Sequence, residues 1–329
     1  MNAVKSIKIL GTGRFIPDNV VTNDDMSRIV DTSDEWIRER TGIEARCFTA
    51  PEVPTSELAA EAITNACRSA GMEPAELDGI IVGTCSPDAI FPSTACWVQD
   101  RLGVRGMPAF DVMAGCSSFL YGLEIASHWI AGNPNLRIAV CGAEVFSKIL
   151  DFKDRRTCVL FGDGAGAAIV GRGRDGSGVL ASNWGSDGTQ ASILNIPAGG
   201  TREPASRATV DERRHFVHME GSKVFKHAVR AMSQGLLDAM AAASVEPDQV
   251  DLFIPHQANI RIMEATRERV RIPQARVHSV LHKYGNISAA SIPVAISEAV
   301  DAGRLKDGDV LAMTAFGTGL TWAASVMRW

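Results

Sequence analysis

Apolar runs alternate with amphipathic stretches along the first half of the chain. Short and nearly unbroken apolar segments at 7–10, 77–84 and 137–141 are typical of strands that are covered on both faces. Between them, small and apolar residues recur at helical spacing over 56–70 and 117–131, which predicts two helices. Strands that alternate with helices predict an α/β fold built on a mostly parallel sheet with helices on its faces.

The same order of elements recurs in the second half. Three pairs of segments align at nearly one offset, close to half the chain length: 70–82 with 243–255, 125–132 with 296–303, and 138–141 with 310–313. We therefore predict two similar halves, 1–172 and 173–329, with chance likeness between helix–turn–strand units as the alternative. In a duplicated fold, the helix that starts near Cys116 has a counterpart that starts near Asn286. The N-termini of these two helices would then face one crevice.

Charge and hydropathy argue against several classes of protein. The net charge of −5 disfavours a duplex nucleic-acid binder, which is normally basic. No apolar run approaches the roughly 20 residues of a membrane span, and the first residues lack the apolar segment of a signal peptide. We therefore expect a cytoplasmic protein with no membrane or nucleic-acid partner.

One of the cysteines stands in a distinctive setting. The chain has seven cysteines and no pair at C-x-x-C spacing, so we expect a reducing compartment, no disulfide framework and no metal site. Cys116 follows the apolar run 107–112 and a tight Ala-Gly step, and it precedes the helix predicted at 117–131. A thiol at a helix N-terminus has a lowered pKa and free N–H groups beside it. Cys116 is therefore a candidate nucleophile, with a packed core cysteine as the alternative.

A histidine and an asparagine in the second half are the candidate partners of this thiol. His256 follows the apolar run 250–255, at the carboxyl end of a predicted strand, where open α/β sheets place ligands. A histidine hydrogen-bonded within a loop is the alternative. Asn286 follows Gly285 in a segment typical of a turn or a helix N-cap, and only the duplication places it opposite Cys116.

Two glycine-rich segments and one loop remain. The segment 161–168 lacks the G-x-G-x-x-G spacing of a dinucleotide site and predicts a tight turn with closely packed backbone. The segment 316–322 follows the apolar run 310–315 and is placed to direct a backbone N–H into a site. The loop 197–214 is either a solvated surface loop, or a cover over a site entrance or a docking surface. It carries four arginines: Arg202, Arg207, Arg213 and Arg214.

Together these motifs resemble the β-ketoacyl-acyl carrier protein synthase III family of the thiolase superfamily. The resemblance rests on Cys116, Pro-His-Gln-Ala-Asn at 255–259, Gly-Asn at 285–286, Phe-Gly-Asp-Gly-Ala-Gly-Ala at 161–167, Thr-Ser-Asp-Glu-Trp-Ile at 32–37 and Arg-Thr-Gly-Ile at 40–43. It implies a thiolase-like αβαβα five-layer α/β fold made of two pseudo-symmetric halves, and a homodimer. It also implies a decarboxylative Claisen condensation of a short acyl-CoA with malonyl-acyl carrier protein, which gives a 3-oxoacyl-acyl carrier protein and initiates fatty-acid synthesis. Coenzyme A thioester enters as a substrate, and no cofactor or metal is implied.

The resemblance further implies roles for individual residues. The catalytic set would be Cys116, His256 and Asn286, and the backbone N–H groups of Cys116 and Thr318 would hold the oxyanion. The residues implied to bind coenzyme A are Trp36, Arg40, Arg155 and Asn259. The residue implied to reach across the dimer and close the partner's acyl pocket is Phe91, and those implied to receive the acidic carrier protein are Lys226 and Arg261.

The sequence departs from the family pattern near the site. Thr318 stands where a third glycine is usual, Ser222 stands where an asparagine is common, and the loop 202–214 is longer than usual. Ser-Ser at 117–118 replaces the frequent Ala-Gly. These departures leave the acyl donor open. One alternative is a condensing enzyme of a specialised pathway that takes a longer or dicarboxylic acyl-CoA, whose free carboxylate would meet an arginine of the loop. The other is an acyl-thioester hydrolase with the same Cys-His-Asn set.

Overall fold

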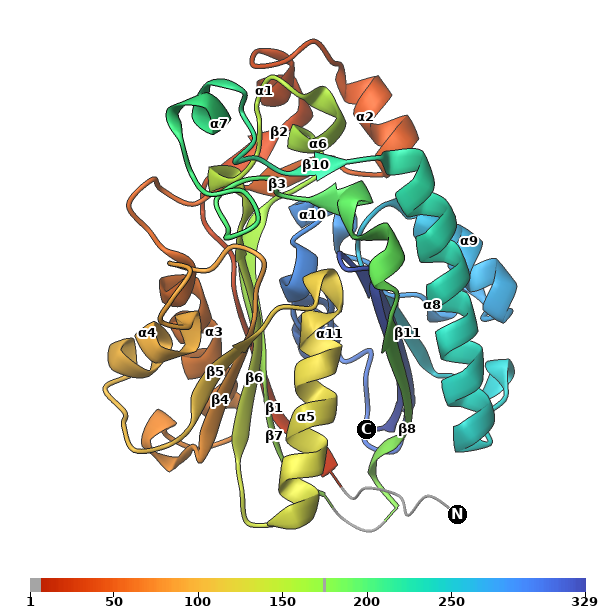
Figure 1. Ribbon diagram of the computed structural model, residues 1–329. Coiled ribbons are helices and arrows are strands. Elements are labelled where there is room, and N and C mark those ends of the chain that lie inside the picture. The colour runs from red at the N-terminus through yellow and green to blue at the C-terminus, as the bar shows by residue number, and fades with distance from the viewer. Residues whose placement is uncertain (1–6, 174–175) are drawn as a thin grey trace.

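The computed structural model describes residues 7–173 and 176–329, which form five layers of helices and sheets (Figure 1). Two sheets are separated by a central helical layer, and each sheet carries further helices on its outer face. The outer layer on the first sheet is α3 (Thr55–Ser69) and α4 (Thr94–Arg101), the central layer is α5 (Ser118–Gly132) and α11 (Ser291–Asp301), and the outer layer on the second sheet is α8 (Gly221–Ala243) and α9 (Ile260–Val270). This is the thiolase-like αβαβα arrangement.

The two sheets have the same strand order. The first runs β1 (Ile7–Phe15), β7 (Asp163–Arg172), β6 (Ile138–Val145), β4 (Gly79–Gly83), β5 (Ala109–Val112), and the second runs β8 (Gly178–Ser186), β13 (Thr321–Arg328), β12 (Val310–Gly317), β11 (Leu252–Pro255). In both, two antiparallel pairs are followed by a parallel pair. The halves are therefore pseudo-symmetric. The boundary between 172 and 173, which falls between β7 and β8, stays a prediction.

The prediction of a mostly parallel sheet is wrong, because both sheets are mixed. Within the described residues, β4 pairs in parallel with β5 and β6, and β11 pairs in parallel with β12, while the other pairs in these sheets are antiparallel. Only three residues, 318–320, join β12 to β13, and a link this short permits an antiparallel pair alone. The continuous apolar runs report that helices cover both faces of each sheet, and not the strand direction.

Smaller elements gather at one end of the molecule, the upper end in Figure 1. They are β2 (Val20–Thr22), α1 (Asn23–Ser27), α2 (Asp34–Thr41), β3 (Ala45–Cys47), α6 (Arg155–Cys158), β9 (Leu194–Asn195), α7 (Arg207–Asp211), β10 (His218–Met219) and α10 (Leu281–Tyr284). The 3₁₀ turns are η1 (Pro74–Glu76), η2 (Gly115–Ser117), η3 (Phe146–Lys148), η4 (Gly188–Ile193), η5 (Pro247–Gln249), η6 (Gln274–Arg276) and η7 (Ser288–Ala290).

The two central helices, α5 and α11, each begin directly after a 3₁₀ turn. Turn η2 leads into α5 and turn η7 leads into α11, as the duplication predicts. Both helices are apolar around most of their surface because they are packed between two sheets, with Phe119 and Ile292 at 1% exposure. No helix within the described part of the chain combines the length and apolarity that a bilayer span requires.

Candidate active site

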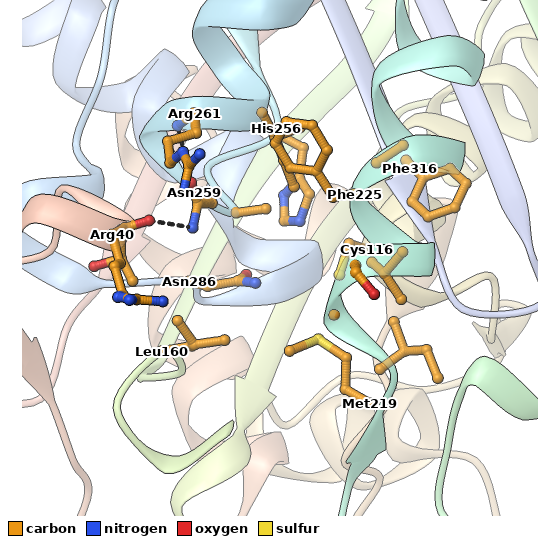
Figure 2. Close-up of a pocket in the computed structure, with 18 of the residues that line it drawn as sticks. Arg40, Cys116, Leu160, Met219, Phe225, His256, Asn259, Arg261, Asn286 and Phe316 are labelled. Carbon is orange, nitrogen blue, oxygen red and sulfur yellow. Dashed lines mark hydrogen bonds between the residues drawn. The ribbon is translucent and has the colours of Figure 1, made fainter. Parts of the chain in front are cut away.

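A cavity of about 580 Å³ brings the three predicted catalytic side chains together (Figure 2). Cys116 comes from η2, His256 follows β11, and Asn286 precedes η7, so both halves contribute. Cys116 and Asn286, which are 170 positions apart in the sequence, thus line one space. A side chain able to act as a nucleophile faces two side chains able to donate hydrogen bonds.

Tight backbone packing sets the position of Cys116. Gly115 has φ +59°, and a Cβ on it would lie 2.3 Å from the Thr318 backbone nitrogen. A Cβ on Gly317 would lie 2.5 Å from the Cys116 backbone nitrogen. Only glycine fits at either position, and the two glycines let the segment after β12 lie directly against η2. The hydroxyl of Ser118 fixes the turn further, since it donates to the Gly115 carbonyl (2.7 Å) and accepts from the Ala114 N–H (2.9 Å).

The thiol of Cys116 does not have the lowered pKa that its place before a helix predicts. Burial raises the pKa of Cys116 to about 12, and this outweighs the lowering by the Ser288 hydroxyl and by the Cys116 N–H. The negative charge of Glu144 raises it further. The sequence-based expectation is wrong because it counted the helix terminus and left out desolvation.

His256 is held as a neutral imidazole. Its backbone N–H donates to the Thr314 carbonyl (2.8 Å), which continues the β11–β12 ladder past the end of β11. The ring Nδ1 is hydrogen-bonded to the Ser291 hydroxyl (2.8 Å), so Nε2 is the nitrogen left for a ligand. Burial lowers the pKa of His256 to about 3. The ring is therefore uncharged at neutral pH.

Asn286 is fixed by three hydrogen bonds. Its side-chain Oδ1 accepts from the Ser288 backbone N–H (2.9 Å). Its backbone N–H donates to the Leu160 carbonyl (2.8 Å), and its backbone carbonyl accepts from the Gly162 N–H (3.1 Å). The amide Nδ2 is left as a donor for the cavity. The prediction of a tight turn at 161–168 is wrong, because most of this glycine-rich segment is the start of strand β7 (Asp163–Arg172). Its closely packed backbone instead supports Asn286 through Gly162. A Cβ on Gly162 would lie 2.5 Å from the Tyr284 carbonyl oxygen.

An aromatic and arginine cluster lies at the edge of this cavity. The guanidinium carbons of Arg40 and Arg155 lie 4.9 and 5.3 Å from the ring centre of Trp36. Trp36 and Arg40 line the cavity, whereas Arg155 does not, and its neighbour Arg156 does. Arg155 donates to the Asp31 carbonyl (2.9 Å). The cluster presents a flat ring and positive charge, which suit a nucleotide and its phosphates.

Three further residues that the sequence predicts to bind substrate or carrier protein also line the first cavity: Asn259, Lys226 and Arg261. Asn259 caps α9 by accepting from the Arg261 N–H (2.8 Å), and its Nδ2 donates to the Arg40 carbonyl (2.9 Å). These two hydrogen bonds fix the orientation of the Asn259 amide and leave one Nδ2 hydrogen and one Oδ1 lone pair for a ligand. Lys226 and Arg261 are exposed where they line the cavity, so their charges are accessible to a partner at the cavity.

A second cavity of about 470 Å³ continues from the first beyond Cys116. Cys116, Phe161 and Leu194 line both cavities. Thr318 also lines the second one, and its hydroxyl donates to the Leu194 carbonyl. Most of the other lining side chains are apolar: Pro87, Ile90, Met113, Phe146, Ile149, Ile196, Ala198 and Val217. Such a lining suits an uncharged hydrocarbon chain attached to Cys116.

Phe91 and the four arginines of the loop 197–214 lie outside both cavities, although Ala198, Gly199 and Gly200 of this loop line the second one. Phe91 is 83% exposed, next to Ile90, which lines the second cavity. Arg213 is paired with Asp151 (2.5 Å) and Arg214 is paired with Glu203 within the loop. The other two arginines, Arg202 and Arg207, are exposed. None of the four lines either cavity, so the hypothesis of an arginine that meets a dicarboxylic donor has no support in the described residues.

The sequence did not predict several polar residues that lie near the site. Glu144 is fully buried and affects the pKa of Cys116, and the signal for it was a lone carboxylate in the apolar stretch 138–145. Ser288 lines the second cavity, and the signal for it was its equivalence to Gly115 under the duplication. Ser291 touches the imidazole without any sequence signal. The part of the chain that the structure describes has no group of three or more potential metal ligands.

Comparison with known proteins shows similarity to the 3-oxoacyl-[acyl-carrier-protein] synthase III family. The family model "3-oxoacyl-[acyl-carrier-protein] synthase III" matches residues 110–188, and the model for the C-terminal part of the same enzyme matches residues 240–329. The β-ketoacyl-[acyl-carrier-protein] synthase III of Caldanaerobacter subterraneus subsp. tengcongensis is 49% identical over 98% of this chain and 97% of that protein. The one of Desulfitobacterium hafniense (strain DSM 10664 / DCB-2) is 48% identical over 98% of each. The crystal structure of 3-oxoacyl-[acyl-carrier-protein] synthase III from Aquifex aeolicus VF5 matches with a TM-score of 0.90 and 44% identity, over 98% of this chain and 100% of that one.

Proposed function

This chain belongs to the 3-oxoacyl-[acyl-carrier-protein] synthase III family, and we propose that it condenses a short acyl-CoA with malonyl-acyl carrier protein. The reaction releases coenzyme A and carbon dioxide and gives the 3-oxoacyl-acyl carrier protein with which fatty-acid synthesis starts. One observation carries the proposal. A half-buried thiol, a neutral imidazole and a carboxamide meet where a polar-mouthed cavity joins an apolar one.

In the first half of the reaction, Cys116 takes the acyl group. Its sulfur attacks the thioester carbonyl, and the backbone N–H groups of Cys116 and Thr318 donate to the oxyanion. The close approach of η2 to the segment after β12 supports this pairing of donors. Coenzyme A leaves as the thiolate, and the acyl chain occupies the apolar second cavity.

In the second half, the malonyl thioester loses carbon dioxide and becomes an enolate. His256 Nε2 and Asn286 Nδ2 donate hydrogen bonds to the enolate oxygen. A neutral imidazole suits this task, because it stabilises developing charge and gives up no proton that would quench the carbanion. The carbanion then attacks the acyl-enzyme at Cys116, and the thiolate of Cys116 leaves.

The surroundings of the site support the proposed partners. Trp36, Arg40 and Arg155 form a platform for the nucleotide of coenzyme A, and Asn259 contacts the pantetheine arm. Two exposed cations receive the acidic carrier protein: Lys226 and Arg261. We place the enzyme in the cytoplasm.

A homodimer is part of the proposal. Strand β5 is at the edge of the first sheet, and large apolar side chains near it are exposed, including Ile90 (82%), Phe91 (83%) and Met113 (69%). An open edge with an apolar rim favours pairing with a second copy. Phe91 would then complete the acyl pocket of the partner. We assign 1–172 and 173–329 as the two thiolase-like halves.

The test is intact mass spectrometry of the protein after incubation with a panel of acyl-CoA substrates. We expect one acyl group on the wild type, none on Cys116→Ala, and loss of the adduct with formation of a 3-oxoacyl thioester when malonyl-acyl carrier protein is added. An adduct that persists on Cys116→Ala contradicts the site. Release of free acid in place of the 3-oxoacyl product contradicts condensation and favours the hydrolase.

A further inference from the structure

A fully buried carboxylate, Glu144, lies close to Cys116 and has no part in the chemistry described above. Its Oε2 accepts from the Ser86 hydroxyl (2.7 Å), the Ser86 N–H (3.2 Å), the Cys85 N–H (3.0 Å) and the Thr84 hydroxyl (3.2 Å). Its Oε1 accepts at longer distance from the Ala289 N–H (3.4 Å). No ion pair with Glu144 occurs within residues 7–173 and 176–329, where all its polar contacts are neutral donors. Burial raises the pKa of Glu144 to about 7 in spite of these hydrogen bonds.

The side chain of Ser288 lies near both the carboxylate and the thiol. It lines the second cavity together with Cys116, and the next residue, Ala289, donates its N–H to Glu144. Ser288 is fully buried, and its Oγ has no hydrogen-bond partner in the resting structure. It lowers the pKa of Cys116 and of Glu144, against the larger raising effect of burial. A buried hydroxyl without a partner is costly, so a local role would explain why it is present.

The backbone of Ser288 adds an independent reason. Its φ is +46°, a left-handed conformation that favours glycine. The equivalent position in the first half is Gly115, with φ +59°. The second half thus keeps a side chain where the fold favours none, and strain of this kind is characteristic of functional positions.

We propose that Ser288 passes the thiol proton of Cys116 to Glu144 as the acyl group arrives, and passes it back when the product leaves. This inference rests on the proposed function. In acylation the S–H bond breaks, the sulfur bonds to the acyl carbon, Glu144 gains the proton, and the coenzyme A thiolate takes a proton from water. After condensation the thiolate of Cys116 leaves the acyl carbon and recovers the proton from Glu144. Over the cycle one proton is taken from solvent, which balances the loss of carbon dioxide from malonate and the release of the coenzyme A thiol.

Other groups near the thiol are poorer acceptors. Burial raises the pKa of Cys85 well above its usual range, so this thiol stays protonated. Burial lowers the pKa of His256 to about 3, so the imidazole does not hold a proton at neutral pH. The titratable groups that face Glu144 within the described residues are the thiols Cys85 and Cys116, and no cation contributes. Glu144 is therefore the neighbour whose protonation changes near pH 7.

The experiment measures the single-turnover rate of Cys116 acylation by acyl-CoA from pH 5.5 to 9, using rapid quench and intact mass. The variants are Glu144→Gln, Ser288→Gly and, as a matched control, Ser117→Ala. Ser117 also has a buried hydroxyl without a partner and adjoins the nucleophile. Glycine suits the φ of residue 288, so Ser288→Gly removes the hydroxyl and relieves the backbone at the same time.

We expect the wild-type rate to fall as the pH drops below about 7, because the carboxylate must be unprotonated to accept the proton. Both relay variants should acylate at least tenfold more slowly at pH 7.5 and lose this inflection. Ser117→Ala should keep the wild-type profile, and Ser288→Gly should be as stable as the wild type in thermal unfolding. Where Glu144→Gln fails to fold, Ser288→Gly decides alone. Wild-type rates and an unchanged profile in Ser288→Gly overturn the relay and leave the proposed function standing, whereas a wild type that no acyl-CoA acylates overturns the function itself.

Discussion

The contact between strand β6 and turn η7 allows a sharp test of how the two halves hold the site together. A Cβ on Gly142 would lie 2.0 Å from the Ala289 carbonyl oxygen and 2.9 Å from the Ala290 nitrogen. The obstacles are backbone atoms of η7, the turn that carries Ser288 and follows Asn286. The substitution Gly142→Ala therefore forces η7 away from β6 by about 1.4 Å, the gap between 2.0 Å and the 3.4 Å at which ordinary contact begins.

Two consequences of different size follow. Overpacking a close-packed interior costs typically about 1–3 kcal/mol, and a rigid backbone obstacle places Gly142→Ala at the upper end, about 3 kcal/mol. A shift of about 1 Å in catalytic groups lowers rates by about a hundredfold. We expect the condensation rate to fall that far, since Asn286 moves with the turn.

The matched control is Gly132→Ala, at the end of α5, where an added Cβ meets nothing within 4 Å. This change should leave activity unchanged and stabilise the protein by up to about 0.5–1 kcal/mol, because alanine is the better helix former. Urea unfolding of the two variants gives the stabilities, and condensation of acyl-CoA with malonyl-acyl carrier protein gives the rates. If Gly142→Ala proves as stable and active as Gly132→Ala, the contact between β6 and η7 does not position the site.

Three further outcomes are expected. Because burial lowers the pKa of His256 to about 3, the folded chain binds fewer protons than the unfolded one between pH 6.5 and 3, so this residue destabilises the fold as the pH falls through that window. His256→Asn should flatten the acid side of the stability curve in urea unfolding at pH 4 to 7, and an unchanged slope contradicts its burial as a neutral ring. Reversing the charge of Lys226 and Arg261 to Glu should raise the KM for malonyl-acyl carrier protein at least tenfold at low salt and less at high salt, while the same change at the exposed Arg202 and Arg207 leaves it within twofold. Equal effects of the two pairs would place the docking surface elsewhere. Pentanoyl-CoA should outcompete glutaryl-CoA at least tenfold as acyl donor because the second cavity is lined by apolar groups and no arginine, and equal use of glutaryl-CoA refutes this.

The sequence predicts the fold and the place of Cys116 well because the evidence for both is local or repeated. Apolar runs mark the strands, and the recurrence in the second half predicts that η2 and η7 lie together. Strand direction and proton chemistry are missed for another reason. A strand buried on both faces has the same pattern in either direction. The pKa of Cys116 depends on burial by segments far away in the sequence, and so does that of Glu144, whose contact at Ala289 is 145 positions distant.

Burial affects His256 and Cys116 in opposite ways, because it favours the neutral imidazole that the proposed reaction uses and disfavours the thiolate. It keeps His256 uncharged, as enolate stabilisation requires, yet the same loss of solvent raises the pKa of Cys116 to about 12 and disfavours the thiolate. The proposed relay gives the thiol proton an internal acceptor whose own protonation changes near neutral pH. Burial brings Glu144 there, because it raises the pKa of this carboxyl to about 7. Burial thus raises the pKa of the Cys116 thiol and also raises the pKa of Glu144 to a value at which it can take up a proton. In the proposed relay, the Ser288 hydroxyl carries the proton between the two.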